Sequence, residues 1–595
     1  EQGVARFVAL VAAGRGRPRQ VALPPASRHW AQADPAAFPW VPELQRLLRQ
    51  HWGHDDLRGL QLPVINALLS GKDVFTVMPT GAGKSLCYQL PILLQTGVAV
   101  VVSPLLSLMQ DQVQALQTRA VKAARLGSDT SKAEEAQVLA DLEAGNLSLL
   151  YVSPERMVYS SENCHRLTRA LRQKHGERCL RYFVLDEAHC ISQWGLDFRK
   201  QYRQLSCLRR DYPGVPILAA TASATERVKK DVIRSLDMQQ AVQFQDTFDR
   251  PNLFLEVRQK ASDAKVVEEI AALARQPLSS GSRACGIVYT LSRKETESVA
   301  RSLTQAGVAS RAYHAGLPPH TRRATFEAWM RGECQVVVAT VAFGMGIDKR
   351  DVRLVCHTCV PSSMERYHQE IGRAGRDGSP CRCVLWYSPA DVQRLRKMAS
   401  KKHEQEQIDL ASRFCGDGSV CRRAALLAYF GEQHQAQRCD ACDVCSRRQS
   451  GGSGSQPQQR QQDLTVEAQQ LLALAAALQE HGLTAAKLRD AAKGKRLPEA
   501  TGRAKNLSAA AAAHGAFGAL RAHSPDFIER LIDKLKQLGV FVERKERAKG
   551  FGKGKRFANL YLALGKEADR LRAGATRVAL PAEAGAVGSA APEDA

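Results

Sequence analysis

The sequence lacks any apolar run approaching the roughly 18 residues that a membrane-spanning helix needs, so no membrane partner is expected. Aromatic residues are few, at 6%, while 44% of the chain is hydrophobic, a composition typical of globular rather than fibrous or disordered proteins. Acidic residues are scarce beside basic ones, 60 against 84, which gives a net charge of +24. This charge favours a polyanionic partner such as nucleic acid, although a basic tail would give the same total.

The 16 cysteines are spread along the chain rather than clustered as in small disulfide-bonded proteins. Several fall inside apolar runs, among them Cys334, Cys356 and Cys383. This pattern favours a reducing compartment. The chain begins at Glu1 without Met, and its opening "FVALVAAGRGRPRQ" contains arginine but no acid. A transit peptide has such a composition, but an incomplete gene model is the simpler interpretation.

Apolar runs with strand character alternate with helical patterns between residues 70 and 240, and a second such series follows. With 595 residues the chain is too long to form one domain around a single hydrophobic core. The alternation predicts two α/β domains, each a parallel sheet covered by helices, with a junction near "FDRPNL" at 248–253. We expect the first domain to occupy residues 41–250 and the second residues 251–395.

The remaining segments differ in composition. Residues 1–40 are expected to be a disordered extension, and residues 396–449 a helical, cysteine-rich subdomain. Residues 450–462 are rich in Gly, Ser and Gln and predict a flexible linker. Residues 463–575 predict a small, mostly helical domain, and residues 576–595 an unstructured tail.

The stretch "FTVMPTGAGKS" predicts a strand, a glycine turn and a helix start. Backbone N–H groups of such a turn close on phosphate oxygens, the lysine neutralises β and γ charges, and the serine hydroxyl reaches Mg²⁺. The strict pattern has Gly where Met78 stands, and a short match of this kind also arises by chance. The predicted nucleotide-binding residues are Thr80, Gly81, Gly83, Lys84 and Ser85.

Two further motifs strengthen this prediction. In "VLDEAH", Asp186 ends an apolar strand and can hold Mg²⁺, while Glu187 can polarise a water for attack on the γ-phosphate. A solvated strand end would explain one acid but not such a pair downstream of the lysine. In "QEIGRAGRDG", Arg373 and Arg376 are three residues apart, which predicts neighbouring turns of one helix face, and could stabilise transition-state charge across the cleft between the domains. A surface charge pair is the alternative for either arginine alone.

Seven segments resemble the RecQ family of superfamily 2 DNA helicases, in family order over residues 50–390. They are "VMPTGAGKSLCYQLP", "SPLLSLMQDQV", "DEAHCISQWGLDFRKQY", "FDRPNL", "AYHAGL", "VATVAFGMGIDK" and "YHQEIGRAGRDG". "DEAH" followed at once by "CISQWG" separates RecQ from other DEAH helicases. The resemblance implies two RecA-like domains, a zinc-binding subdomain, a winged-helix domain, and ATP- and Mg²⁺-dependent movement 3′ to 5′ on DNA.

In RecQ proteins the segment after "DEAH" is an aromatic-rich loop that senses single-stranded DNA. The resemblance places four residues of this chain on it, Trp194, Phe198, Arg199 and Tyr202. Aromatic faces stack on bases at about 1–3 kcal/mol each, and arginine adds a phosphate or cation–π contact. Leu196 stands where the family usually has His, so coupling to DNA is expected to differ. Core packing is the alternative role for Trp194.

The segment "HWGHDDLRGLQ" resembles the family's adenine-recognition motif. It implies that Gln61 reads the adenine edge with its amide, helped by Arg58. Leu57 replaces the usual Phe and Leu60 the usual Gly. We therefore expect this segment to select adenine in the bound nucleotide, although two positions depart from the family's motif.

Four cysteines in the spacing C-x-x-C-x-x-C plus one upstream allow thiolates to form a closed tetrahedral shell around a structural Zn²⁺. They match the zinc subdomain of RecQ proteins and are Cys421, Cys439, Cys442 and Cys445. Cys415 and His434 are nearby donors that we expect to be bystanders.

Residues 463–575 resemble the family's winged-helix domain. "SPDFIERLIDKLKQLGVF" predicts an amphipathic helix before a basic, glycine-rich β-wing that grips duplex backbone. Phe551 between two glycines and Lys553 near the tip are predicted DNA contacts, with Phe551 as a wedge against the terminal base pair. A mobile phosphate clamp is the alternative.

Together these motifs predict an ATP-dependent DNA helicase that uses ATP, Mg²⁺ and Zn²⁺ and acts on single-stranded and branched DNA in recombination, repair and replication. The family implies the nucleus in a eukaryote, or the nucleoid or cytoplasm in a bacterium. An RNA remodelling enzyme on the same core and a junction-binding scaffold with weak ATPase are the alternatives. The sequence does not identify protein partners.

Overall fold

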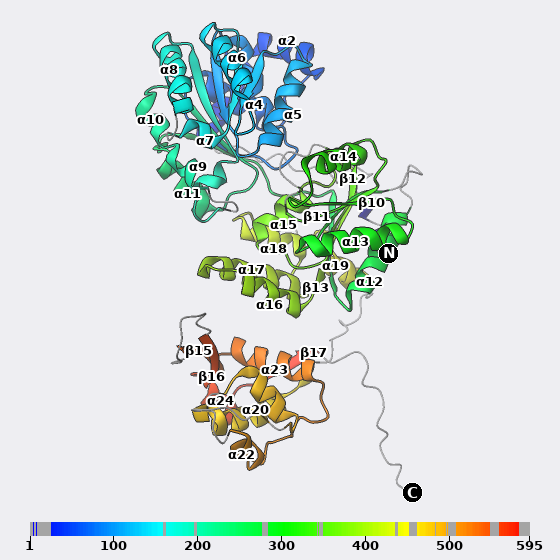
Figure 1. The fold of residues 1–595 in the computed structure, drawn as a ribbon. Helices are drawn as coiled ribbons and strands as arrows, with labels where there is room; N and C mark the ends of the chain where they lie inside the picture. Colours follow the sequence, from blue (N-terminus) through cyan, green and yellow to red (C-terminus); the bar gives the residue numbers. More distant parts are fainter. Residues whose placement is uncertain are drawn as a thin grey trace. The chain divides into compact units, whose positions relative to one another are not determined.

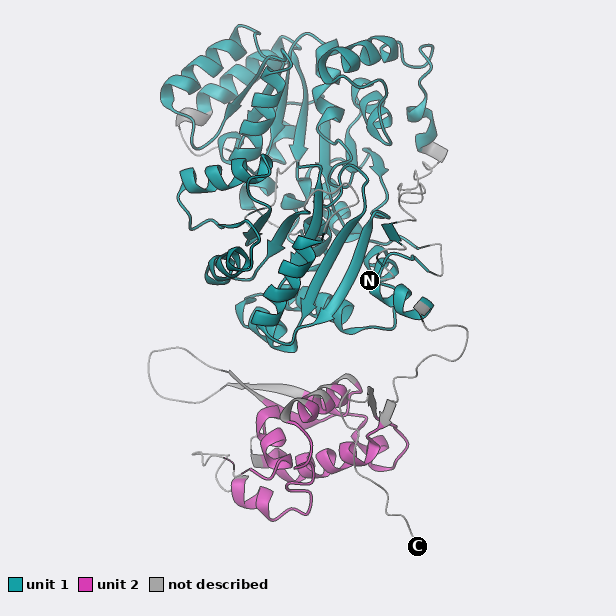
Figure 2. Ribbon diagram, turned by 90° about the vertical axis from the view of Figure 1, so that its right-hand side faces the viewer, with its two compact units in different colours: residues 1–450 teal, residues 451–595 magenta. Residues whose placement is uncertain are grey.

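A computed structural model gives the chain two compact units, residues 1–450 and 451–595 (Figures 1 and 2). Within the described residues, no helix combines the length and apolar character required to cross a membrane. The structure describes residues 4, 7–8, 25–158, 162–195, 199–276, 284–341, 343, 349–434, 438–450, 461–481, 483–495, 497, 507–547 and 558–581.

The first half of unit 1 is built on a seven-stranded parallel sheet with the order β3-β4-β2-β5-β6-β1-β7. Its central strands are apolar and buried on both faces, as parallel sheets require. The strands are β1 Val74–Val77, β2 Val98–Val102, β3 Ala123–Leu126, β4 Leu149–Val152, β5 Leu180–Asp186, β6 Ile217–Thr221 and β7 Val242–Gln245.

Helices pack on both faces of this sheet, because neighbouring residues of one strand, such as Val100 and Val101, enter two different core clusters. Local signals set several helix starts: Ser131 and Glu134 form a reciprocal capping box at α6. The helices are α2 Val41–Trp52, α3 Gln61–Leu69, α4 Leu86–Gln89, α5 Leu106–Gln117, α6 Lys132–Glu143, α7 Pro154–Met157, α8 Glu162–Gly176, α9 Lys200–Gln204, α10 Cys207–Asp211 and α11 Glu226–Ser235.

The second half contains a six-stranded parallel sheet, order β10-β11-β9-β12-β13-β8. The predicted pair of parallel-sheet domains is therefore confirmed. The elements are β8 Leu253–Gln259, α12 Asp263–Arg275, β9 Cys285–Tyr289, α13 Arg293–Gln305, β10 Ser310–Tyr313, α14 Pro319–Met330, β11 Val336–Ala339, β12 Val352–His357, α15 Met364–Ile371, β13 Cys381–Tyr387 and α16 Pro389–Met398.

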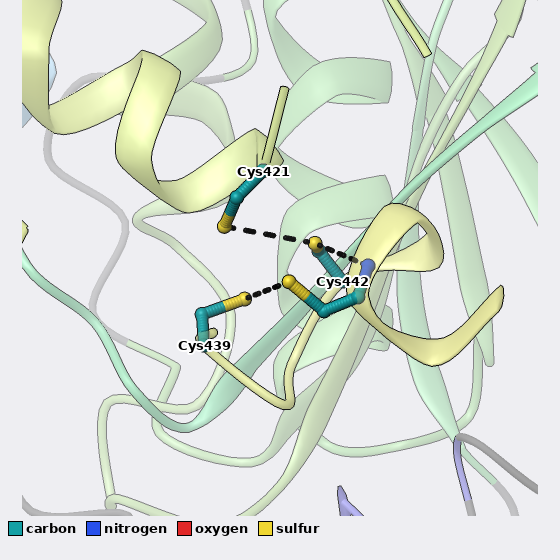
Figure 3. Close-up of side chains that lie close together, drawn as sticks. Cys421, Cys439 and Cys442 are labelled. Atoms are coloured by element: carbon teal, nitrogen blue, oxygen red, sulfur yellow. Dashed lines mark hydrogen bonds between the residues drawn. The ribbon is translucent and has the colours of Figure 1, made fainter. Parts of the chain in front are cut away.

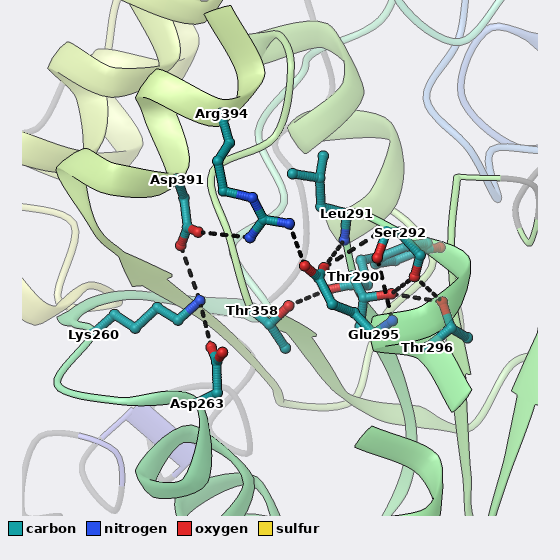
Figure 4. A network of polar contacts seen from close by, with 11 residues as sticks. Lys260, Asp263, Thr290, Leu291, Ser292, Glu295, Thr296, Thr358, Asp391 and Arg394 are labelled. Carbon is teal, nitrogen blue, oxygen red and sulfur yellow. Dashed lines mark hydrogen bonds and ion pairs between the residues drawn. The ribbon is translucent and has the colours of Figure 1, made fainter. Parts of the chain in front are cut away.

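A polar network fastens α16 to this second sheet (Figure 4). Lys260, just after β8, contacts Asp391 of α16 at 3.0 Å and Asp263 of α12 at 2.8 Å. Arg394 of α16 pairs with both Asp391 and Glu295, and Glu295 also caps α13. Because α16 leads directly into the cysteine-rich segment, the network fixes where that segment begins.

The cysteine-rich segment adds α17 Lys402–Gly416, α18 Arg422–Tyr429 and α19 Asp443–Ser450. It joins the second sheet at edge strand β8, where Leu255 N donates to Ala441 O at 3.0 Å. Phe414, Leu426 and Leu427 belong to the main core cluster of unit 1. The segment is therefore part of unit 1 rather than a separate body.

Unit 2 has its own apolar core, to which α20 and α23 contribute Leu471, Leu472, Leu531 and Leu535. Strands β15 and β16 form an antiparallel pair directly after α23. The winged-helix assignment stays a prediction. The elements are β14 Gln461–Asp463, α20 Thr465–Leu478, α21 Ala485–Ala492, α22 Leu507–Ala512, α23 Pro525–Gln537, β15 Phe541–Arg547, β16 Ala558–Leu564, α24 Ala568–Arg572 and β17 Ala579–Pro581.

Two expectations of disorder do not hold for the residues that the structure describes. Residues 25–40 pack on α3, where Asn66 Nδ2 donates to Trp30 O and Trp40 Nε1 donates to Asn66 Oδ1, each at 2.9 Å. Aromatic burial on the first domain explains this order. At the other end, β17 pairs with β14, so parts of the expected tail and linker form a small sheet.

Candidate nucleotide and DNA site

The glycine turn after β1 has the shape expected of a phosphate-binding loop. Gly81 and Gly83 have φ of 90° and 80°, a backbone region that glycine occupies without strain. Lys84 Nζ donates to Met78 O at 3.3 Å, and Ser85 immediately precedes α4. Met78, at the position where the strict pattern has Gly, is 1% exposed and packs in the core. Its side chain thus fills core space beside Cys87, whose Sγ lies 3.8 Å from Met78 Sδ, which explains why the departure is tolerated.

Gln61 braces this loop from α3. Its Nε2 donates to Ala82 O at 3.2 Å and Gly83 O at 3.3 Å, while its Oε1 accepts from Arg58 N at 2.8 Å. A Cβ at Gly83 would lie 2.2 Å from Gln61 Nε2. The structure therefore couples the segment of Arg58 and Gln61 to the phosphate loop, and adenine reading by these two residues stays a prediction.

The two acids of "DEAH" lie in different electrostatic environments. Burial, together with the neighbouring charge of Glu187, raises the pKa of Asp186 to about 6. Burial alone would raise the pKa of Glu187 as well, but the charge of Lys84 and a hydrogen bond with His189 lower it to about 2. Glu187 is therefore ionised at neutral pH, as a water-polarising carboxylate should be.

His189 was not singled out by the sequence, and it connects two motifs. Its Nδ1 lies 3.3 Å from Glu187 Oε2 and 2.8 Å from Thr221 Oγ1 at the end of β6. Thr221 Oγ1 in turn contacts Ser223 O at 3.1 Å. The Thr221 hydroxyl at the end of β6 is thus joined through His189 to the predicted catalytic glutamate.

The predicted arginine pair lies opposite the phosphate loop but not on a helix face. α15 ends at Ile371, before both arginines, so the helical placement was wrong; Gly372 and Gly375, the latter with φ of 55°, turn the chain there. Arg373 is 4% exposed. A Cβ at Gly81 would lie 3.2 Å from Arg376 Cγ, so Arg376 packs directly on the loop. The catalytic roles of the two arginines stay predictions.

Arg250, in the junction segment "FDRPNL", joins the two halves of this site. Its Nη1 donates to Thr80 O at 3.4 Å and to Gly372 O at 3.2 Å. Its Nη2 donates to Ala374 O at 2.7 Å and to Gly375 O at 3.0 Å. The sequence indicated a domain junction here but not this role, because all four acceptors are backbone carbonyls that leave no signature.

Trp194 of the aromatic loop is 37% exposed and lies between two cationic or titratable side chains. The Arg227 guanidinium of α11 is 3.2 Å from the Trp194 ring centroid, and the His403 ring of α17 is 5.7 Å away, edge to face. Ser192 Oγ accepts from Trp194 N and donates to Asp231 at 2.7 Å. The loop is therefore held by both the first domain and the cysteine-rich segment.

Arg199 and Tyr202, also in the aromatic loop, make hydrogen bonds to backbone carbonyls of the first domain. Arg199 Nη1 donates to Pro104 O at 2.8 Å. Tyr202 is fully buried, and its hydroxyl contacts Val102 O at 3.1 Å and Asp186 O at 2.8 Å. The prediction that Tyr202 contacts DNA does not fit this burial; the residue instead ties the loop to the Asp186 backbone. Phe198 lies outside the described residues, as do Phe551 and Lys553 of the predicted wing.

The four predicted zinc ligands converge, and Figure 3 labels three of them, Cys421, Cys439 and Cys442. Their sulfur atoms all lie within 4.8 Å of one another, with Cys439 Sγ to Cys445 Sγ at 3.8 Å and Cys442 Sγ to Cys421 Sγ at 3.9 Å. Zn–S bonds of about 2.3 Å in a tetrahedron place sulfurs at about these separations, so the donor set fits Zn²⁺. Among the described residues, neither Cys415 nor His434 joins the cluster.

Comparison with known families matches three consecutive parts of the chain. The DEAD/DEAH box helicase family matches residues 58–232, the helicase conserved C-terminal domain residues 266–378, and the RecQ zinc-binding family residues 389–446. ATP-dependent DNA helicase Q1 of Rattus norvegicus is 41% identical over 427 residues, which cover 71% of this chain and 67% of that protein. The chain belongs to the RecQ family.

Two other RecQ relatives show how much of the chain is shared. ATP-dependent DNA helicase Q-like 2 of Arabidopsis thaliana is 41% identical over 71% of this chain and 59% of its own length. ATP-dependent helicase SGS1 of Saccharomyces cerevisiae is 36% identical over 77% of this chain but only 32% of its own length. RecQ membership supplies the cofactors that the site fits: ATP and Mg²⁺ at the phosphate loop and Zn²⁺ at the four cysteines.

Proposed function

We propose that this RecQ protein hydrolyses ATP to move 3′ to 5′ along one DNA strand and to unwind forked or branched duplexes. The observation that carries the proposal is the contact of Arg250 and Arg376, from the junction and the second sheet, with the phosphate loop of the first. A site shared by two domains can convert hydrolysis into opening and closing of the cleft between them.

Each residue has a role in this reaction. Lys84 would neutralise the β- and γ-phosphates, and Ser85 and Asp186 would hold Mg²⁺, which would neutralise charge that develops on the phosphates. Glu187, ionised and oriented by His189, would polarise the attacking water. Arg373 and Arg376 would stabilise the transition state from the other domain.

The geometry also supports coupling between DNA and the ATP site. Trp194 is exposed enough to stack on a base, and Tyr202, in the same loop, contacts the backbone of Asp186. Movement of the loop when DNA binds would therefore shift the backbone of Asp186, whose carboxylate would hold Mg²⁺. Stacking on every base, rather than reading its edge, suits movement along any sequence.

Relatives that carry DNA helicase in their names support DNA as the substrate. We propose action in the nucleus, in recombination, repair and replication, in line with the eukaryotic relatives and the net charge of +24.

The test is ATP hydrolysis by the purified chain with single-stranded DNA, with RNA of the same sequence and without nucleic acid, beside unwinding of duplexes with a 3′ or a 5′ tail. We expect strong DNA stimulation and unwinding from the 3′ tail, and loss of both in Lys84→Ala. Equal stimulation by RNA would favour the RNA remodelling alternative. Tight fork binding with little stimulated hydrolysis would favour the scaffold.

A further inference from the structure

The hinge segment, residues 246–252 between β7 and β8, is gripped by side chains of the zinc-binding subdomain. Glu432, just after α18, accepts hydrogen bonds from Thr247 Oγ1 and, at 2.8 Å, from Phe248 N. The rings of Phe430 and Phe248 stack with centroids 4.4 Å apart and planes at 19°. Two hinge residues are thus fixed by a part of the chain that follows both sheets.

A second contact with the hinge comes from a residue beside the zinc cluster. Arg423 lies two residues after the zinc ligand Cys421 and its side chain is 5% exposed. Its guanidinium pairs with Asp249 and donates to Leu253 O at 2.7 Å. The Arg423 guanidinium is buried, so leaving it without its carboxylate partner is unfavourable, and this contact resists movement of Asp249 relative to the zinc site.

The hinge residue after Asp249 is Arg250, which bonds to Thr80 O of the phosphate loop and to the turn that carries the arginine pair. On the other side, His368 of α15 lies 3.3 Å from Phe248 O. The cavity between the hinge, α15 and α18 has a volume of only about 10 Å³, the space of one water molecule. Such packing leaves the hinge little freedom to turn while the subdomain stays in place.

We propose that the zinc-binding subdomain sets the angle of the hinge, with Glu432 and Arg423 as positioning residues that place Arg250 against the phosphate loop. The subdomain would thereby control closure of the ATP cleft as well as stabilise the fold. The proposal rests on the proposed ATP hydrolysis for its kinetic consequence, but its structural part is testable without nucleotide.

The first test is amide hydrogen exchange over residues 246–253 in the full chain without ATP or DNA. Glu432→Ala removes the acceptor of the Phe248 amide, and we expect exchange in this peptide to rise about tenfold or more through local opening. Glu406→Ala is the matched control: it lies in the same subdomain, is 60% exposed and pairs with Lys402 at 3.9 Å. Wild-type exchange in Glu432→Ala would overturn the proposal.

A second pair of variants covers the case in which Glu432→Ala fails to fold. Thr247→Val removes the hydroxyl that donates to Glu432 and that accepts from Asp249 N at 3.0 Å, whereas Thr247→Ser keeps both hydrogen bonds. We expect faster exchange at the Phe248 amide in Thr247→Val, with zinc content unchanged, and recovery in Thr247→Ser. Equal exchange in both would overturn the proposal.

The kinetic test is a double-mutant cycle on DNA-stimulated ATP hydrolysis. We expect Glu432→Ala and Thr247→Val each to lower kcat about fivefold with little change in KM, since the hinge acts in closure rather than in binding. The double variant should lose less than the product of the two single losses, because both variants remove the hydrogen bond between Thr247 Oγ1 and Glu432. If the double variant instead loses the product of the two single losses in kcat, the proposal is overturned. A wild-type chain without ATPase would overturn the proposed function, while hydrogen exchange would still decide the hinge contact.

Discussion

Asp186 and Glu187 are neighbours in sequence, yet the pKa of one is raised to about 6 and that of the other is lowered to about 2. Burial and the charge of Glu187 raise the pKa of Asp186, whereas a hydrogen bond with His189, added to the charge of Lys84, outweighs burial and lowers the pKa of Glu187. At the scale of single residues, the site thus holds two neighbouring carboxylates whose pKa values move in opposite directions.

The raised pKa of Asp186 predicts a stability effect. Without Mg²⁺ the folded state binds a proton between pH about 6 and 3.8 that the unfolded state has released, so its stability falls as pH rises through this window. Asp186→Asn removes the buried charge, and we expect it to stabilise the metal-free chain at pH 7.5 by about 3 kcal/mol. Thermal unfolding at pH 7.5 and pH 5 checks this. The gain should shrink at pH 5; an equal gain at both values would contradict the assigned cause.

Trp194 gives the second residue-scale prediction. Replacing it with alanine removes the exposed stacking surface, worth about 1–3 kcal/mol, and leaves the phosphate loop unchanged. We expect Trp194→Ala to lower DNA stimulation of ATP hydrolysis about tenfold while basal hydrolysis persists. Met398→Ala, also exposed and on α16, is the control. Retained stimulation in Trp194→Ala would assign the ring to packing against Arg227 and His403.

At the scale of elements, apolar runs predicted strands well where the strands are buried, as in β2 and β12. Edge strands such as β10, "SRAY", are half exposed and lack the apolar run by which a strand could be predicted. The burial of Tyr202 and the role of Arg250 depend on partners far away in the sequence, including backbone carbonyls that any residue supplies. The cysteine cluster was readable because metal ligation fixes both residue type and spacing.

The zinc cluster is an element whose loss should affect the whole of unit 1. A closed four-sulfur shell has no open position for chemistry, so Cys442→Ser should cost stability rather than a catalytic step. We expect loss of bound zinc, a lower Tm and a parallel fall in DNA binding and ATPase. Cys415→Ser, a buried cysteine outside the cluster, should keep its zinc. Full zinc content in Cys442→Ser would contradict the ligand assignment.

At the scale of the whole molecule, the phosphate loop, the arginine turn, the hinge and the zinc cluster all lie in unit 1, while unit 2 has a separate core. A chain ending at residue 450 should therefore keep DNA-stimulated ATP hydrolysis. If unit 2 grips duplex DNA as predicted, fork unwinding should fall about tenfold or more with the loss of its phosphate contacts. Gel-based unwinding beside ATPase measurements separates the two; unchanged unwinding would leave unit 2 without a role at the fork.

The position of Trp194 has a practical consequence. All six tryptophans lie in described parts of the chain, and Trp194 is the most exposed of them, with a guanidinium 3.2 Å from its ring centroid. A change in its neighbours on DNA binding would therefore change its emission, so the native protein carries its own optical reporter. Titration with unlabelled oligonucleotides, followed by fluorescence in the native chain and in Trp194→Phe, would isolate the part of the signal that this ring contributes.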